Sequence, residues 1–280
     1  MFDTTIILIS YKSEKLILNF IKKLPKLIPI IIIDNSNSFL LEDVIKKEYS
    51  NLEIFVKKND GVSSALNYAV DKTKTKYFLQ ISPDINFDYN DILIYLDLAK
   101  KLNNRFAAIG PRFLDIKKKS HKQILESVDY DTIDSIHGSC MFINKECFNK
   151  IGRFDENYFL YFEETDFFTR CIKKNKKIYL YEKFEVKHGG SISINMKYKN
   201  DFYIFKSWHY CWSKFYYYRK HFNYLVGLSK TFPNLKRSIF GMIKNLILRN
   251  SLNFKLNNAE FRGLIKSYLL MKSKHRMNID

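Results

Sequence analysis

The chain has 280 residues, of which 46% are hydrophobic, so its composition predicts a sizeable buried core and argues against a disordered protein. Its net charge is +18, and +12 of this lies in residues 201–280, which hold 15 Lys and Arg against 3 Asp and Glu. We therefore expect the last eighty residues to meet a polyanionic partner.

The cysteines and the N-terminus indicate the compartment. The four cysteines form no CxxC pair and have no metal-type spacing, which predicts reduced thiols. Asp3 precedes a short apolar run, residues 6–9, which is too short for the core of a signal peptide. No apolar run approaches the roughly 20 residues that span a bilayer. We expect a cytoplasmic protein without a transmembrane segment.

Strand-like and helix-like patterns alternate through the first hundred residues. The expected strands are short apolar runs rich in β-branched residues, as in strands buried on both faces. The expected helices have apolar residues at helical spacing. The strands are residues 4–9, 29–33, 52–56 and 77–81, and the helices are residues 14–24, 40–49, 61–70 and 91–102.

These repeated βα units predict an α/β fold with a doubly wound, mainly parallel sheet. Ligands bind such sheets beyond the carboxyl ends of the strands. Each polar strand end is typical of an ordinary loop, but four together indicate a shared binding crevice. The ends are Ser10-Tyr11, Asp34-Asn35, Asn59-Asp60-Gly61 and Ser82-Pro83-Asp84.

The pattern is less regular after residue 102. We expect a charged loop or flap, a strand interrupted by a His-Gly-Ser sequence, two helices and a short strand. These are residues 115–134, 136–143, 145–151, 164–175 and 177–181, with Gly152 ending the first of the two helices. Composition changes near residues 195–201, which predicts a catalytic domain at 1–200 and a helical, basic and aromatic region at 201–280.

The C-terminal region interleaves aromatic and basic side chains, and residues 235–248 and 261–271 have the spacing of basic amphipathic helices. Trp and Tyr beside cations suit peripheral contact with a membrane or a lipid diphosphate. Alternatively, the aromatics form a small helical core and the lysines are solvated. Such interleaving also occurs in nucleic-acid-binding proteins, but no recognised module fits, so we expect no nucleic-acid partner.

Several short motifs follow one another between residues 4 and 193. They are Asp34-Asn35-Ser36, Asn59-x-Gly61 with Asn67, Ser82-Pro83-Asp84, Gly152-x-Phe154-Asp155-Glu156, Phe162-Glu163-Glu164-x-Asp166 with Arg170, and His188. In this order and spacing they resemble family 2 glycosyltransferases, and more narrowly the bacterial rhamnosyltransferase-like branch. The resemblance implies the GT-A fold, a nucleotide-binding α/β sandwich, and a nucleotide diphosphate-sugar donor.

The resemblance assigns donor binding to the strand ends. Asp34 would accept a hydrogen bond from the imide N–H of uracil or thymine, and Gly61 would let the backbone approach the ligand. A capping role for Asp34 and a turn role for Gly61 are the simpler alternatives. The expected donor-binding residues are Ser10, Tyr11, Asp34, Asn35, Asn59, Gly61, Asn67, Ser82, Asp84 and Arg170.

The resemblance also implies a divalent cation. Asp84 matches the second acid of the family's Asp-x-Asp signature, whose first acid is replaced here by Ser82. His188 matches the histidine that completes the family's metal site. We therefore expect Asp84, His188 and substrate phosphates to hold Mn²⁺ or Mg²⁺. The missing first acid leaves metal-independent binding as the alternative.

Glu163, Glu164 and Asp166 place three carboxylates at an expected helix start. An acidic first turn is the simpler explanation, but the aromatic run at 158–162 would set these acids against a partly dry wall. By motif match Glu164 is the base that removes the acceptor proton, with Glu163 as second candidate. Asp166 and Arg170 are expected to support it. Many relatives carry Asp at the base position, so Glu164 is a departure.

Together these features predict an inverting glycosyltransferase. The resemblance favours dTDP-rhamnose or a similar deoxysugar as donor, with a UDP-sugar as the alternative. The expected acceptor is a polyprenyl-diphosphate-linked saccharide of surface polysaccharide assembly, such as O-antigen, at the inner face of the cell membrane. Ser82 also leaves open a catalytically inactive partner subunit of the same fold.

Overall fold

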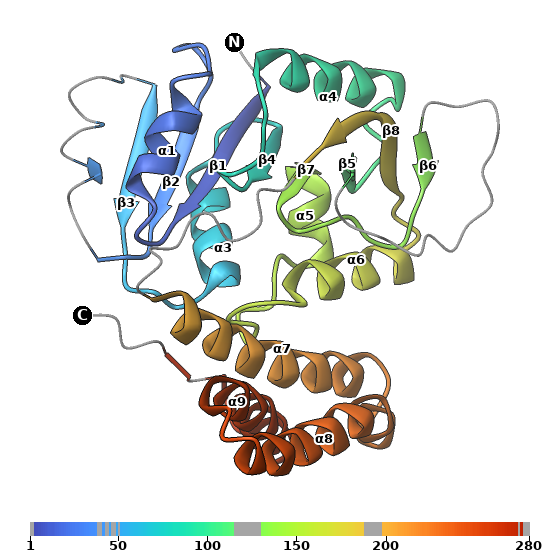
Figure 1. Cartoon of the computed structure of the whole chain (residues 1–280). Helices are drawn as coiled ribbons and strands as arrows, with labels where there is room; N and C mark the ends of the chain where they lie inside the picture. Colours follow the sequence, from blue (N-terminus) through green and yellow to red (C-terminus); the bar gives the residue numbers. More distant parts are fainter. Residues whose placement is uncertain are drawn as a thin grey trace. The chain divides into compact units, whose positions relative to one another are not determined.

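The computed structural model describes residues 3–37, 41–42, 45, 49, 51–114, 130–187, 198–273 and 275–276. The chain forms two compact units, a sheet with flanking helices and a group of helices (Figure 1). The first unit contains residues 1–60, 64–154 and 164–193, and the second contains residues 61–63, 155–163 and 194–280.

The sheet of the first unit is mainly parallel. Its described strands are β1 (Thr4–Ser10), β2 (Ile30–Asp34), β3 (Leu52–Val56), β4 (Tyr77–Ile81), β5 (Ala108–Phe113), β6 (Tyr130–Thr132), β7 (Cys140–Asn144) and β8 (Ile178–Val186). They lie in the order β3-β2-β1-β4-β7-β5-β8-β6. The first four are parallel, β7 is antiparallel to β4 and β5, and β6 is antiparallel to β8. The predicted doubly wound α/β class is therefore confirmed.

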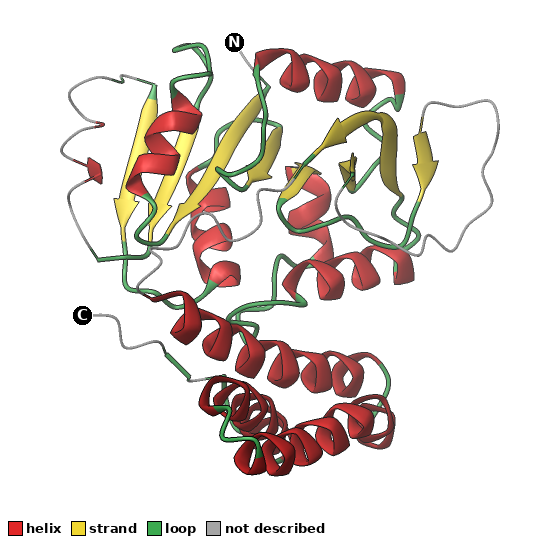
Figure 2. Ribbon diagram, in the orientation of Figure 1, coloured by secondary structure: helices red, strands yellow, loops and turns green. Residues whose placement is uncertain are grey.

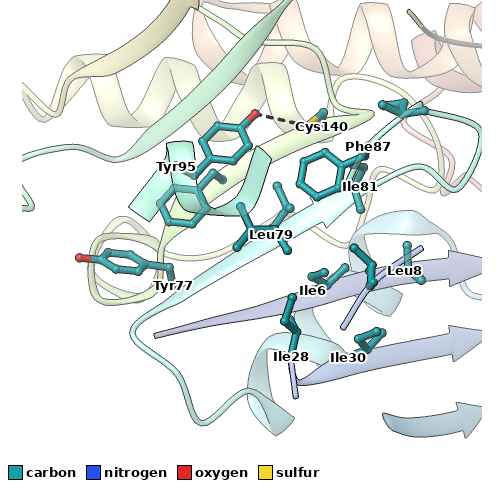
Figure 3. Packing of buried hydrophobic residues seen from close by; sticks show 14 of the residues in the cluster. Ile6, Leu8, Ile28, Ile30, Tyr77, Leu79, Ile81, Phe87, Tyr95 and Cys140 are labelled. Carbon is teal, nitrogen blue, oxygen red and sulfur yellow. Dashed lines mark hydrogen bonds between the residues drawn. The ribbon is translucent and has the colours of Figure 1, made fainter. Parts of the chain in front are cut away.

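Helices cover both faces of this sheet (Figure 2). The described helices of this part of the chain are α1 (Glu14–Ile21), α3 (Val62–Lys72), α4 (Tyr89–Lys101), α5 (Lys145–Ile151) and α6 (Glu163–Lys173). On one face, α1 and α4 share a core with Ile6 and Leu8 of β1. Figure 3 shows Ile6, Leu8 and Tyr95 of α4 in this core. On the other face, the ring of Phe148 in α5 lies 5.2 Å from that of Phe78 in β4.

The core explains why the central strands read as continuous apolar runs. Strands β2 and β4 are buried along their whole length, as expected for parallel strands covered on both faces. The Tyr95 hydroxyl and the Cys140 sulfur lie 3.4 Å apart within this core (Figure 3). Burial raises the pKa of Cys140 to about 12. All four cysteines are free and buried.

The second half of the sheet differs from the sequence-based prediction. Strand β5 was missed because Gly110-Pro111 signals a turn, whereas the ladder shifts register after Pro111 and the strand continues. Strand β6 lies in the expected loop at 115–134, of which 115–129 is outside the described residues. Strand β7 begins at Cys140, so the His-Gly-Ser sequence precedes it. Most of the expected helix at 40–49 is also outside the described residues.

The second unit is built on α7 (Lys199–His221), α8 (Tyr224–Ile247) and α9 (Ser251–Tyr268), which pack side by side (Figure 1). Four aromatics of α7 are buried and form a small helical core, as one of the two expectations from sequence has it; membrane contact, which can hold at the same time, stays a prediction. The four aromatics are Phe205, Trp208, Trp212 and Phe215. Among the described residues, no helix is both long and apolar enough to cross a membrane.

Residues 155–163 belong to this second unit although they lie between α5 and α6 in the chain. The Phe159 ring lies 5.7 Å from that of Phe205 and 4.7 Å from that of His209. Lys220 Nζ donates to Asp155 Oδ2 over 2.7 Å. The sequence-based boundary at residue 200 placed this segment in the first domain, because nothing in its composition reveals these distant partners.

His209 is held neutral inside the second unit. Its Nε2 lies 3.0 Å from the His275 carbonyl oxygen and its Nδ1 lies 3.0 Å from Ser273 Oγ. Nε2 therefore donates to the carbonyl and Nδ1 accepts from the hydroxyl. Burial lowers the pKa of His209 to about 3 from an ordinary value of 6.5.

This histidine predicts an acid-sensitive stability. Because the folded pKa lies below the unfolded one, the unfolded chain binds the extra proton as pH falls below 6.5. The free energy of unfolding should fall with a slope approaching about 1.4 kcal/mol per pH unit from this group alone. Urea titrations between neutral pH and pH 4 should show a shallower pH dependence of the free energy of unfolding for His209→Gln than for wild type. Equal slopes for wild type and His209→Gln would contradict this.

Candidate functional site

The carboxyl ends of β1 and β2 bring the first predicted residues together. Ser10 and Asp34 are register partners in the parallel ladder, and the Asn35 N–H donates to the Ser10 carbonyl oxygen over 2.9 Å. Ser10 and Asn35 are buried. Tyr11 follows directly, and burial raises the pKa of its hydroxyl. Four predicted donor-binding residues therefore lie at one edge of the sheet.

Asp34 has an unused acceptor atom at this edge. The residue is fully buried, and its Oδ1 accepts the Ser36 N–H over 2.8 Å. Its Oδ2 is buried and has no hydrogen-bond partner among the described residues. Burial raises the pKa of this carboxyl. A buried carboxylate oxygen without a donor is costly, and an N–H from a ligand would remove that cost.

The loop after β4 lies at the same edge. Ser82 and Asp84 are both half-buried there. The Ser82 N–H donates to the Ser139 carbonyl oxygen over 2.8 Å, and the Ile85 N–H donates to the Ser82 carbonyl oxygen over 3.1 Å. The backbone therefore turns directly after the strand, as the Ser-Pro-Asp sequence predicts.

Residues 137–139 join this edge from the antiparallel strand. Since β7 runs against β4 and Cys140 pairs with Ile81, the residues before β7 lie where β4 ends. His137 Nδ1 lies 2.5 Å from Ser139 Oγ, which fixes the imidazole within the loop. Sequence reasoning noted these residues only as an interruption of a strand and did not count them among the site residues.

Glu164 lies beside this loop. A Cβ added to Gly138 would lie only 3.4 Å from the Glu164 carboxyl carbon. Because Ser139 is bonded to Ser82, Gly138 brings Glu164 near the loop that contains Asp84. A glycine inside a strand-like run signals such a close approach and could have pointed to this contact.

Asp166 and Arg170 hold α6 in place. Asp166 is fully buried, and its Oδ2 accepts from Arg170 Nε over 2.9 Å. The Arg170 guanidinium also donates to the carbonyl oxygens of Ile151, Gly152 and Arg153. Gly152 ends α5 in the left-handed conformation, with a φ of 103°. These bonds engage Nε, Nη1 and Nη2 of the guanidinium, and the support role expected for Asp166 and the donor-binding role expected for Arg170 stay predictions.

Asn67 and Asn59 lie around α3. The Asn67 amide donates to the Phe154 carbonyl oxygen over 3.0 Å and accepts the Phe154 N–H over 3.2 Å. Asn67 is buried and ties α3 to the chain after α5, and its expected contact with the donor stays a prediction. Asn59 is half-buried in the loop before α3.

Gly61 and Glu163 belong to the second unit. Gly61 has a φ of 101°, and a Cβ there would lie 2.6 Å from the Phe159 carbonyl oxygen. This packing alone requires glycine, in addition to the close ligand approach expected from sequence. Glu163 is buried at the first position of α6.

The described residues do not by themselves provide a metal cage. His188 lies outside them, so only Asp84 of the expected pair is seen. No group of three or more His, Cys, Asp or Glu side chains in the described part of the chain could hold a metal ion. One carboxylate would depend on substrate phosphates and water for the remaining ligands.

Comparison with known proteins matches residues 5–152 to the sequence model of Glycosyl transferase family 2. The low-salt glycan biosynthesis hexosyltransferase Agl10 of Haloferax volcanii is 26% identical over 198 residues, covering 63% of this chain and 64% of Agl10. The match therefore spans less than two thirds of that relative. Rhamnosyltransferase WbbL of Escherichia coli is 25% identical over 190 residues, covering 57% of this chain and 72% of WbbL.

The fold is also found among solved structures. Mannosyltransferase PcManGT from Pyrobaculum calidifontis, in complex with GDP-Man and Mn²⁺, has a TM-score of 0.57 and 12% identity, and the match covers 95% of this chain and 86% of that one. At this identity the likeness shows the fold alone. The fold is GT-A, as the motifs predicted.

The Asp166–Arg170 clamp predicts a strong effect on stability. Arg170→Met should lower the free energy of unfolding by about 3–5 kcal/mol, because the fully buried Asp166 carboxylate loses this charged partner. Adding Asp166→Leu should recover much of that loss, since the buried charge is then absent. Urea denaturation measures both effects.

A surface pair provides the control. Lys101 Nζ and Asp97 Oδ2 are 2.8 Å apart with side chains 61% and 59% exposed, so Lys101→Met should change stability little. Comparable losses in Lys101→Met and Arg170→Met would contradict the special position of the buried pair.

Proposed function

Because the chain belongs to glycosyl transferase family 2, we propose that it is an inverting glycosyltransferase that uses a nucleotide diphosphate-sugar donor and a saccharide acceptor. The observation that carries the donor assignment is the buried Asp34 carboxylate, whose Oδ2 has no hydrogen-bond partner among the described residues. Its neighbours at the strand ends, Ser10 and Asn35, offer further polar groups.

The Oδ2 of Asp34, without a hydrogen-bond partner in the described part of the chain, favours a donor nucleotide whose base is uracil or thymine. Both bases carry an imide N–H that would donate to Oδ2, whereas cytosine has an acceptor nitrogen at the same ring position. The rhamnosyltransferase-like motifs and the similarity to WbbL favour dTDP-rhamnose or a similar deoxysugar. A UDP-sugar presents the same imide and is the second candidate.

Glu164 is the proposed base. The acceptor hydroxyl oxygen would form a bond to the anomeric carbon while the bond from that carbon to the diphosphate oxygen breaks on the opposite side. The hydroxyl proton would pass to the Glu164 carboxylate, and the nucleoside diphosphate would leave with the electron pair. The position of Glu164 beside Gly138 and the loop of Asp84 supports this role.

The proposal includes a divalent cation because Asp84 and His188 match the metal-binding positions of the family motif. Asp84, His188 and the donor phosphates would hold Mn²⁺ or Mg²⁺, which would offset the charge of the leaving diphosphate. The proton transfer to Glu164 and the displacement at the anomeric carbon need no ligand from this cation. Because Ser82 replaces the first acid of the signature, the need for a metal is open. Measuring nucleotide binding with and without Mn²⁺ tests it directly.

The proposed acceptor is a saccharide on a polyprenyl diphosphate, at the inner face of the cell membrane, in surface polysaccharide assembly. The similarity to a glycan biosynthesis enzyme and to a rhamnosyltransferase supports this class. The alternative is a partner subunit of the same fold without transfer activity. Such a subunit would bind no nucleotide sugar, so a screen of dTDP- and UDP-sugars by thermal shift separates the two.

Asp34→Asn tests the donor site. The Ser36 N–H requires an acceptor at the Oδ1 position, so the new amide N–H₂ would replace Oδ2 and face the imide N–H. Affinity for dTDP and UDP should fall about ten- to a hundredfold, as expected for losing a hydrogen bond to a charged acceptor. Calorimetric titration measures this loss, and CDP affinity should not fall.

The free Asp34→Asn protein should be at least as stable as wild type at neutral pH. Burial raises the pKa of Asp34, so the folded state disfavours the charged form that the amide replaces. Asp97→Asn on the exposed side of α4 is the matched control and should bind all nucleotides normally. Equal losses for dTDP, UDP and CDP would contradict the proposed imide contact.

Glu164→Gln tests the base. The amide cannot accept the proton, so turnover should fall by about a hundredfold or more while dTDP or UDP binding is retained. Initial rates with the preferred sugar nucleotide, together with nucleotide titrations, separate these effects. Glu163→Gln should lose less activity, and exposed Glu146→Gln should match wild type. If Glu163→Gln is inactive and Glu164→Gln turns over normally, the two roles are reversed.

A further inference from the structure

Helix α8 is amphipathic, but it exposes large apolar side chains and buries small and polar ones within the second unit. Seven of its large apolar side chains are between 40% and 75% exposed, and four smaller residues on its opposite side are buried. The exposed residues recur at helical spacing and so form one continuous apolar face. They are Leu225, Phe232, Ile239, Phe240, Ile243, Leu246 and Ile247, whereas the buried ones are Gly227, Thr231, Asn234 and Ser238.

Contacts on the buried side fix the rotation of α8. Thr231 Oγ1 lies 2.9 Å from the Tyr268 hydroxyl of α9, and Lys214 Nζ of α7 donates to Asn234 Oδ1 over 2.7 Å. A Cβ added to Gly241 would lie 2.3 Å from Asn257 Oδ1 of α9, so α8 and α9 are close there. Rotating the apolar face inward would break these bonds and place large side chains where only small ones fit.

Cations border the apolar face, and α8 contains no acidic residue. Lys230, Arg237 and Lys244 are each seven residues apart, which places them along one flank of the face. Arg237 donates to both carboxylate oxygens of Glu260 at 3.0 Å. Lys236 lies at helical spacing within the apolar row itself, between Phe232 and Ile239, and is exposed.

We propose that α8 docks this face on an anionic phospholipid surface. The helix would lie along the membrane, with its apolar side chains in the acyl boundary and Lys230, Lys236 and Lys244 at the phosphates. A helix of 24 residues presents a row about 36 Å long. Long lysine stems suit this position because they reach from apolar surroundings to the headgroups.

A second copy of the chain fits the face less well. Interfaces between copies are depleted in lysine, and a twofold contact through α8 would bring two basic rows together, in each of which Arg237 is paired with Glu260. The excess of 15 basic over 3 acidic residues in 201–280 favours a negatively charged occupant instead. The charge and the apolar row together select anionic lipid.

Vesicle co-sedimentation of the full chain tests the proposal. Wild type should bind vesicles with about 30% phosphatidylglycerol and bind pure phosphatidylcholine more weakly. The triple variant Phe240→Ser, Ile243→Ser, Ile247→Ser should lose about tenfold or more in partitioning, because three large exposed side chains no longer insert. Lys230→Gln with Lys244→Gln should reduce the preference for phosphatidylglycerol and its salt dependence.

Controls distinguish docking from damage to the fold. Leu27→Ser changes a side chain that is 78% exposed in the first unit, and it should bind vesicles as wild type does. The triple variant should keep its unfolding temperature and nucleotide affinity, because its changed residues are exposed. No binding of wild type to anionic vesicles, or equal binding by the triple variant, would overturn the proposal.

Analytical ultracentrifugation without lipid tests whether the apolar face of α8 is instead an interface between two copies of the chain. A wild-type dimer that the triple variant converts to a monomer would identify the face as an interface between copies and would also overturn lipid docking. The inference does not rest on sugar transfer. Vesicle binding without nucleotide binding would remove only the proposed function, and the reverse result would remove only this inference.

Discussion

The parallel register between β1 and β2 is the constraint on which the candidate donor site depends. Residues 6–10 pair one to one with residues 30–34, which brings Ser10 level with Asp34 at the carboxyl edge. A slip by one residue would turn the Asp34 carboxylate to the opposite face and align Ile33 with Ser10. Since β2 is buried on both faces, alternation of polar and apolar residues does not select the register. The polar strand ends select it, because they cannot enter the apolar core without losing hydrogen bonds.

The acidic cluster divides its carboxylates between structure and chemistry. Asp166 is committed to Arg170, whose guanidinium also binds the last carbonyls of α5. This clamp positions the first turn of α6, from which Glu164 reaches Gly138. Asp34 differs from Asp166, because its Oδ2 is buried and has no hydrogen-bond partner among the described residues. A satisfied buried carboxylate supports the fold, whereas an unsatisfied one is suited to a ligand.

The first hundred residues could be predicted closely because each strand is an apolar run bounded by polar clusters. The shared edge of Ser10, Asp34 and Ser82 followed from parallel topology alone. Contacts made across the sequence could not be predicted. The approach of Gly138 to Glu164 depends on the pairing of β4 with β7, and the Asn67 amide bonds the backbone of Phe154. The beginning of α8 was missed because small and polar residues face its core, opposite to the usual pattern. The metal question depends on His188, which lies outside the described residues.

The excursion of residues 155–163 into the second unit has a consequence for how the chain is made and divided. Helix α7, which packs on Phe159 and bonds Asp155, is synthesised only after the described strands of the sheet. The segment leading into α6 can therefore make these contacts only after α7 has been synthesised. Contacts between residues far apart in the sequence slow folding. A fragment that ends near residue 200 would retain the described strands but would lack the helix that covers the aromatic segment directly before Glu164. Cutting the chain near residue 200 would therefore divide the second unit.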